Sequence, residues 1–182
     1  TGKFEIKGDY ADVTLIVYAP NATVTNTGTF KKIQINAISE NTWIENAQNN
    51  YLDLNASKAH IIVGGSVAGL EINSGSKNIA VENNGTISRI AINAAATLDI
   101  TGTNRTKIPV QSDATGAMIK TSIPLTVDAT KEFAFHVRSG AETSTISIVN
   151  ESASPTIEGL GIISVTNKET NTVNDVVAEN TE

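Results

Sequence analysis

The stretch "GTISRIAINAAATLDITGT", Gly85–Thr103, repeats a pattern found 20 residues earlier as "GSVAGLEINSGSKNIAVEN", Gly65–Asn83. Both contain an apolar-x-apolar-Asn phrase, then a turn, then a second apolar-x-apolar pair. Two more copies of the phrase lie upstream, so that its four starting residues are Ile33, Leu52, Leu70 and Ile90, at intervals of 19, 18 and 20 residues. A repeat of this length predicts a solenoid, in which each unit stacks on its neighbours.

The alternation of apolar and polar residues is that of β-strands, and the 3.6-residue period of helical repeats is absent. Each unit has two or three strand-like pieces separated by Gly or Asn turns, which predicts an all-β parallel β-helix with coils of about 18–20 residues and three short strands per turn. A further apolar residue precedes each phrase, at Phe30, Tyr51, Val67 and Ile87. Two interior columns are expected, Ile33/Leu52/Leu70/Ile90 and Ile35/Leu54/Ile72/Ile92.

The repeat is regular over residues 1–103 and weaker afterwards. We expect residues 104–166 to form irregular coils or a cap of the same domain, and residues 167–182 to form a polar tail or linker. Pro109 and Pro124 suit strand edges and corners rather than central strands. The alternative fold is a short β-helix with an antiparallel β cap, or a β-sandwich.

The Asn that closes each phrase recurs in register, at Asn36, Asn55, Asn73 and Asn93. Asn tolerates the left-handed conformation of a sharp corner. Stacked Asn amides can also bond to one another from coil to coil, as in cross-β structures. Four in register predict a structural ladder that runs from coil to coil along one corner of the stack.

Composition restricts the possible partners. The net charge is −6 and no basic run occurs, which argues against nucleic acid as a partner. No apolar stretch approaches the roughly 20 residues of a membrane-spanning helix. The chain has no Cys, which excludes disulfides and thiolate metal sites, and His60 and His136 lack metal-binding spacing. We therefore expect no cofactor and no metal site.

Residues 28–102 resemble the pectin-lyase-like right-handed parallel β-helix, as found in repetitive bacterial cell-surface and surface-layer-associated proteins. The phrases "GTFKKIQINA" and "GTISRIAINA" carry this resemblance. Many such β-helices are polysaccharide lyases or hydrolases, but the catalytic motifs of the lyases are absent here. The resemblance thus implies a structural or adhesive segment of an exported bacterial surface protein, extracellular and without catalytic activity, with cell-wall or host glycans or other surface proteins as partners.

The alternative function is a carbohydrate-binding module or a polysaccharide-active enzyme. Asp53 and Glu71 occupy outward positions on adjacent coils, close enough for paired acid chemistry or a Ca²⁺ contact. No basic or hydrogen-bonding partner is evident beside them, and we expect two solvated carboxylates. Trp43, the single Trp, either packs in the core or protrudes as a sugar-stacking platform, because a shift of one residue reverses the direction of its side chain.

Overall fold

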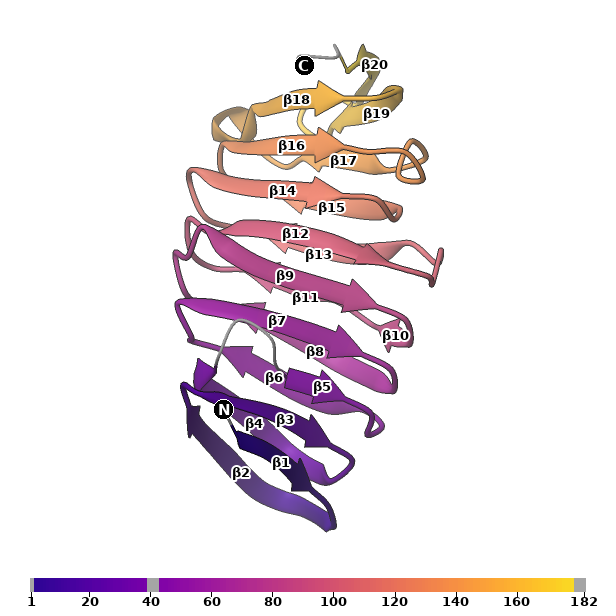
Figure 1. Cartoon of the computed structure of the whole chain (residues 1–182). Coiled ribbons are helices and arrows are strands. Elements are labelled where there is room, and N and C mark those ends of the chain that lie inside the picture. Colours follow the sequence, from indigo (N-terminus) through magenta and orange to yellow (C-terminus); the bar gives the residue numbers. More distant parts are fainter. Residues whose placement is uncertain (1, 39–42, 179–182) are drawn as a thin grey trace.

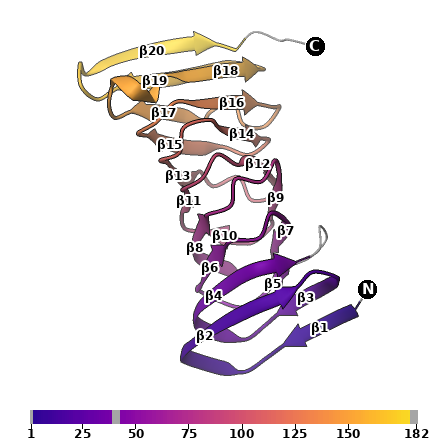
Figure 2. The same cartoon turned by 90° about the vertical axis from the view of Figure 1, so that its left-hand side faces the viewer.

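The protein is a parallel β-solenoid of about 8 turns. The computed structural model describes residues 2–38 and 43–178. Figure 1 shows the coils stacked from the N-terminus to the C-terminus, and Figure 2 shows the two sheets from the side. All strand pairs are parallel except the last, β19 with β20.

Two sheets form the walls of the solenoid, and each coil contributes one strand to each. The first sheet contains β1 (Gly2–Ile6), β3 (Ala22–Asn26), β5 (Trp43–Glu45), β7 (Lys58–Val63), β9 (Asn78–Asn83), β12 (Thr97–Gly102), β14 (Ala117–Thr121), β16 (Phe133–Val137) and β18 (Pro155–Gly159). The second contains β2 (Asp9–Ala19), β4 (Thr29–Ile38), β6 (Asn50–Leu54), β8 (Ser66–Ile72), β11 (Ile90–Ile92), β13 (Ile108–Ser112), β15 (Leu125–Ala129), β17 (Thr145–Ile148), β19 (Ile162–Asn167) and β20 (Thr172–Val177). The short strand β10 (Thr86–Ile87) pairs with β8, and a 3₁₀ turn, η1, spans Glu151–Ala153.

The prediction of three short strands per turn is wrong. The apolar residue before each phrase belongs to the same strand as the phrase itself, so that β8 contains both Val67 and Leu70. Among the described residues, only β10 forms a separate strand at this position. A continuous strand keeps the backbone in one hydrogen-bonded ladder and leaves fewer unpaired groups at corners.

The two predicted interior columns are confirmed. Strand pairing aligns Ile33, Leu52, Leu70 and Ile90, and the residue two positions later in each strand forms the second column. All eight side chains are fully buried. Stacked aliphatic side chains of this kind carry most of the hydrophobic stabilisation of a solenoid, because each coil buries its apolar edge only against its neighbours.

Tyr51, one of the apolar residues that precede the repeated phrases, does not lie in the core. A register irregularity between Asn50 and Tyr51 pairs Asn50 with Val67 and Tyr51 with Gly69. Asn50 therefore takes the interior position and is fully buried, whereas Tyr51 lies on the outer face of the second sheet, only partly buried.

The coils continue through residues 104–166, with β13–β19 extending the same two sheets. Pro109 lies inside β13, between two neighbouring strands, against the expectation for proline. The Ile108 amide donates to Pro124 O, on the β15 side. Backbone amides alternate in direction along a strand, so an amide at position 109 would face β11. Strand β11 pairs with β13 only from Val110 onward. The missing donor therefore removes no ladder bond.

The C-terminal segment also differs from the polar tail expected for residues 167–182. Residues Thr172–Val177 form β20, which pairs antiparallel with β19 and covers the last parallel edge of the second sheet. Covering an edge removes a row of unpaired backbone groups that would otherwise recruit another chain. Residues 179–182 of the expected tail lie outside the described residues.

Candidate functional site

The outer face of the second sheet brings the predicted acid pair together. Asp53 on β6 is aligned with Glu71 on β8, one coil above. Both side chains point away from the interior columns, and both are largely covered, with side-chain exposures of 11% for Asp53 and 17% for Glu71. They are therefore not the freely solvated carboxylates that the sequence led us to expect.

Each carboxylate has a cationic partner. Lys32 Nζ lies 2.8 Å from Asp53 Oδ2, and Arg89 donates to Glu71 Oε1 at 2.7 Å. The expectation that no basic or hydrogen-bonding group stands beside them is thus wrong. Both cations sit directly before the apolar phrase of their own coil, and stacking of successive coils places them against the acids of a neighbouring coil.

Tyr51 links the two ion pairs. Its hydroxyl donates to Glu71 and accepts from Arg89 at 2.7 Å, while the Arg89 guanidinium carbon lies 5.5 Å from the ring centroid and Lys32 Nζ lies 6.0 Å from it. The ring crosses Gly69, where an added Cβ would come within 2.6 Å of Tyr51 Cε2. Because Lys32 approaches the ring from a coil below and Arg89 from a coil above, Tyr51 does not offer a free face on which a sugar could stack.

The electrostatics of this cluster favour fixed charges over proton transfer. Burial acts to raise the pKa of Glu71, but the hydrogen bonds from Tyr51, Asn93 and Arg89 together with the Arg89 charge outweigh it, and the net pKa is lowered. Burial and the neighbouring Glu71 raise the pKa of the Tyr51 hydroxyl. A general acid needs a carboxyl whose pKa is raised, so Glu71 is poorly suited to that role.

The four repeated Asn side chains form a continuous chain of amide bonds. Asn55 donates to Asn36 at 3.0 Å, Asn73 to Asn55 at 3.2 Å, and Asn93 to Asn73 at 3.0 Å. Asn73 also donates to Asp53, and Asn93 to Glu71 at 2.6 Å, which joins the ladder to the ion pairs.

The four Asn residues are exposed, so the ladder lies on the outer surface of the solenoid. Their backbone conformation differs from the left-handed corner that was expected. None of them has a positive φ; among the described non-glycine residues only Asn49 and Asn171 do. Asn recurs here because its amide can both donate and accept along the stack, and not because the corner requires a left-handed residue.

Trp43 lies in the core. Its exposure is 0%, and its Nε1 donates to Glu45 Oε2 at 2.9 Å. It is aligned with Val24 below and Ile61 above, both of which point inward. Trp43 therefore cannot serve as a surface platform for sugar rings.

A buried carboxylate beside Trp43 is the main group that the sequence analysis missed. Glu45 is fully buried and accepts hydrogen bonds from Asn26 at 2.9 and 3.1 Å, from Asn50 at 3.2 Å and from the Ala47 amide at 3.1 Å. Burial raises the pKa of Glu45, and these hydrogen bonds only partly oppose that effect. We call Asn26, Trp43, Glu45 and Asn50 the buried polar cluster.

The remaining titratable groups do not form a metal centre. Within the part of the chain that the structure describes, no group of three or more His, Asp or Glu side chains is placed to hold a metal ion. His60 and His136 lie on different coils, beside Glu82 at 3.6 Å and Glu158 at 4.0 Å respectively. The candidate site therefore consists of a surface array of paired charges and amides, with a separate polar cluster inside the same coils.

Comparison with known proteins adds no assignment: no protein family, no curated protein and no solved structure matches this chain. Over residues 2–38 and 43–178, no helix is long and apolar enough to cross a membrane. Any proposal of function therefore rests on the sequence pattern and on the geometry described above.

Proposed function

We propose that this chain is a structural or adhesive β-solenoid segment of an exported bacterial cell-surface protein, without catalytic activity. One observation carries the proposal: the polar groups of the candidate site are satisfied within the protein. Asp53 pairs with Lys32, Glu71 with Arg89 and Tyr51, and the Asn ladder with itself and with both acids. A catalytic pair would have to release these bonds before it could act on a substrate.

Several sequence features support the exported, extracellular part of the proposal. The sequence is rich in Thr and Asn, charged residues are sparse at 18%, and Cys is absent. The repeated phrase resembles that of bacterial surface β-helices. In this role the stacked coils hold a rigid, elongated shape and present a sheet face or turns to cell-wall glycans, host glycans or other surface proteins.

The test is an activity and binding assay on the purified chain. We expect no release of unsaturated products from pectate or alginate, with or without Ca²⁺. The matched control is the double variant Asp53→Ala/Glu71→Ala, assayed in parallel and checked for folding by circular dichroism. Product release by the parent protein that this variant lacks would establish a polysaccharide lyase instead.

A glycan array separates the alternative, a carbohydrate-binding module, from the main proposal. Because Asp53 and Glu71 are occupied by internal partners, binding of an adhesive segment to a glycan or a surface protein should survive the double substitution. Selective glycan binding that disappears in Asp53→Ala/Glu71→Ala would instead assign the second-sheet face as a sugar-binding site.

A further inference from the structure

Asn84 and Gly85 combine a labile chemistry with a position in the middle of the solenoid. They are the only Asn-Gly pair in the 182-residue sequence, and they lie between β9 and β10, where the first sheet turns into the second. In an Asn-Gly pair, the backbone nitrogen of glycine can attack the side-chain amide carbon of asparagine, because glycine has no Cβ to hinder the approach. This corner is therefore a candidate site of covalent modification.

Packing at the corner requires glycine at position 85. A Cβ added to Gly85 would lie 2.0 Å from Gly65 O and 2.8 Å from Gly64 C, both in the backbone of the coil below. Gly65 shows the same constraint one coil lower, where an added Cβ would lie 2.0 Å from Ala47 O. The corners stack too closely for any larger residue, so the fold itself retains the glycine that makes the pair labile.

Asn84 is held by the coil above and by its own strand. Its Oδ1 accepts hydrogen bonds from the Thr103 amide and from the Thr103 hydroxyl, both at 3.1 Å. Its Nδ2 donates to Glu82 Oε1 at 2.7 Å. A carboxylate at position 84 could accept the bonds from Thr103 but could not donate to Glu82. Asparagine fits this corner because its amide accepts and donates at once.

These hydrogen bonds direct the two reacting groups to different coils. The Gly85 amide donates to Val63 O at 2.7 Å in the coil below, and the Asn84 amide donates to the same oxygen at 2.9 Å. The side-chain carbonyl of Asn84 is directed instead to Thr103, in the coil above. Attack of the Gly85 nitrogen on the Asn84 side chain requires both sets of bonds to break, which means local opening of the coil stack at this corner.

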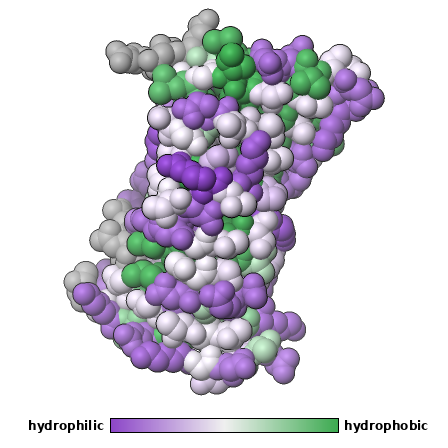
Figure 3. Space-filling model, turned by 90° about the vertical axis from the view of Figure 1, so that its right-hand side faces the viewer, coloured by the Kyte–Doolittle hydropathy of each residue, from purple (hydrophilic) through white to green (hydrophobic). Residues whose placement is uncertain are grey.

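The corner also lies where water can take part in a reaction. Figure 3 faces the side of the molecule on which strands of the first sheet turn into the second, and hydrophilic or intermediate surface covers most of its middle coils. The side chain of Asn84 is exposed, and Gly85 is half-buried. Solvent is therefore in contact with the side chain before the corner opens, and it can reach the backbone nitrogen once it does.

We propose that Asn84 is a deamidation site and that opening of the coil stack controls the reaction. The Gly85 nitrogen bonds to the side-chain carbon of Asn84, the bond from that carbon to Nδ2 breaks, and ammonia leaves with the proton given up by the Gly85 nitrogen. The resulting succinimide ring is opened by water, which adds to either of its two carbonyl groups. The products are aspartate or isoaspartate at position 84, and water is the only other reactant.

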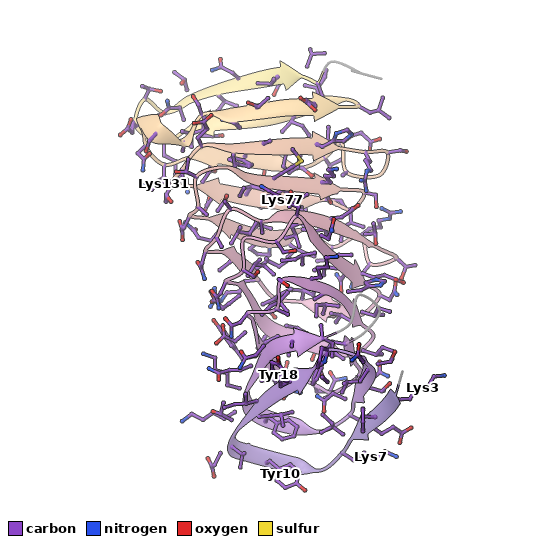
Figure 4. All side chains as sticks on the ribbon, turned by 60° about the vertical axis from the view of Figure 1, so that its left-hand side comes forward. Lys3, Lys7, Tyr10, Tyr18, Lys77 and Lys131 are labelled. Carbon is purple, nitrogen blue, oxygen red and sulfur yellow. The ribbon has the colours of Figure 1, made fainter. Side chains whose placement is uncertain are left out.

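The products fit the corner less well than asparagine does. A carboxylate would face Glu82 as a second negative charge, where Asn84 now donates a hydrogen bond. Figure 4 shows Lys77 at the corner that precedes β9, at the opposite end of this strand from Asn84. Arg105, in the coil above, is bonded to Ser122 O. Neither cation is placed to neutralise the new charge.

Deamidation is therefore expected to loosen the contact between coils permanently. Isoaspartate has a further effect, because it lengthens the main chain by one atom and disturbs the register of the corner with both neighbouring coils. Closing of the stack does not restore the lost amide. This inference does not depend on the proposed function, since a catalytic or sugar-binding solenoid with the same corner would undergo the same reaction.

The experiment follows deamidation of the full chain in mildly alkaline buffer, by peptide mass spectrometry with chromatographic separation of aspartate from isoaspartate. The folded protein is compared with the same protein unfolded in urea. Thr103→Val removes the hydroxyl that donates to Asn84. Thr97→Val, on the adjoining strand β12, is the matched control, because the Thr97 hydroxyl forms no hydrogen bond within the described residues. Circular dichroism confirms that both variants are folded.

In the unfolded chain we expect Asn84 to deamidate before any other asparagine. Folding should slow the reaction about tenfold or more, because only the open corner reacts. Thr103→Val should speed the reaction of the folded protein about threefold, through the loss of one hydrogen bond, whereas Thr97→Val should leave the rate unchanged. Asn84→Asp, which has the aspartate product at this position from the start, should unfold at a lower urea concentration than the parent protein.

Several results would overturn the proposal. Equal rates in the folded and the unfolded protein would show that coil stacking does not control the reaction, and so would equal rates in Thr103→Val and Thr97→Val. Faster deamidation at another asparagine of the unfolded chain would remove the special role of the Asn84–Gly85 pair. An Asn84→Asp variant as stable as the parent protein would contradict the loosening of the corner.

Discussion

Two carboxylates on neighbouring coils, Glu45 and Glu71, have opposite surroundings. Glu45 lies inside the solenoid in the buried polar cluster, where its partners are amide and indole N–H groups and its pKa is raised. Glu71 lies outside on the second sheet, where Arg89 neutralises it and its pKa is lowered. A carboxylate in this fold can therefore either accept hydrogen bonds inside the solenoid, as Glu45 does, or form an ion pair between coils on the surface, as Glu71 does.

The inner network satisfies the backbone where the chain turns between sheets. Asn26 bonds both the amide and the carbonyl of Gly28, while Asn50 accepts from the Phe30 amide and donates to Gly28 O. Glu45 accepts from the Ala47 amide and holds both Asn side chains. The outer array instead ties one coil to the next through side chains alone. Removal of an inner member should therefore cost far more stability than removal of an outer one.

The largest effect is expected for Glu45→Leu. Leucine would leave the donors of Asn26, Trp43 and Asn50 buried without their acceptor, and each such group is costly, so the free energy of unfolding should fall by about 3 kcal/mol or more. Urea denaturation followed by circular dichroism measures this change. Glu132→Leu, at an exposed site, is the control and should shift the midpoint little. Equal midpoints for the two variants would mean that the buried cluster contributes nothing to stability.

A smaller effect, with a defined pH dependence, is expected for Glu45→Gln. Because the pKa of Glu45 in the folded state is raised above its ordinary value of 4.5, the unfolded chain releases this proton first as pH rises. Stability contributed by protonated Glu45 is present below pH 4.5 and is lost as pH rises through the folded-state pKa. The advantage of the parent protein over Glu45→Gln should therefore shrink with rising pH. An advantage that grows with pH would contradict the raised pKa.

Sequence periodicity was sufficient for the parallel solenoid and its interior columns, but not for the number of strands per coil or for the site. Regular apolar spacing identified Ile33, Leu52, Leu70 and Ile90 as one column, because a repeated coil forces equivalent residues into register. It did not reveal the register irregularity that moves Asn50 into the interior, since spacing alone does not show a bulge. The partners of Asp53 and Glu71 were missed for a related reason: Lys32 and Arg89 reach them across coils, at sequence separations that no local motif displays.

An intermediate effect is expected on the outer ladder, where Asn73→Leu should destabilise the protein more than Asn78→Leu. Asn73 donates to Asn55 and Asp53 and accepts from Asn93, whereas Asn78 is an exposed residue at the start of β9. Because the ladder is on the surface, water can replace some of the lost bonds, and the difference should be about 1 kcal/mol. Denaturation midpoints of the two variants measure it. Identical midpoints would show that the stacked amides are dispensable.

The smallest effect is expected for Glu71→Gln, and its pH dependence should be opposite to that of Glu45→Gln. The pKa of Glu71 in the folded state is lowered below 4.5, so its contribution is present above pH 4.5 and is lost as pH falls through the folded-state value. The Arg89–Glu71 pair is partly exposed, with Arg89 at 47%, so the loss at neutral pH should be below about 1 kcal/mol and should decrease further in high salt.

Unfolding of the parent protein and of Glu71→Gln at about pH 3, pH 5 and pH 7, each in low and in high salt, tests this expectation. The two proteins should converge in acid and differ most at neutral pH in low salt. Arg89→Gln is the matched variant: because it removes the other half of the same pair, the double variant should lose little more than either single one. A difference that persists unchanged in acid would mean that Glu71 acts through packing rather than through its charge, and the contrast with Glu45 would then fail.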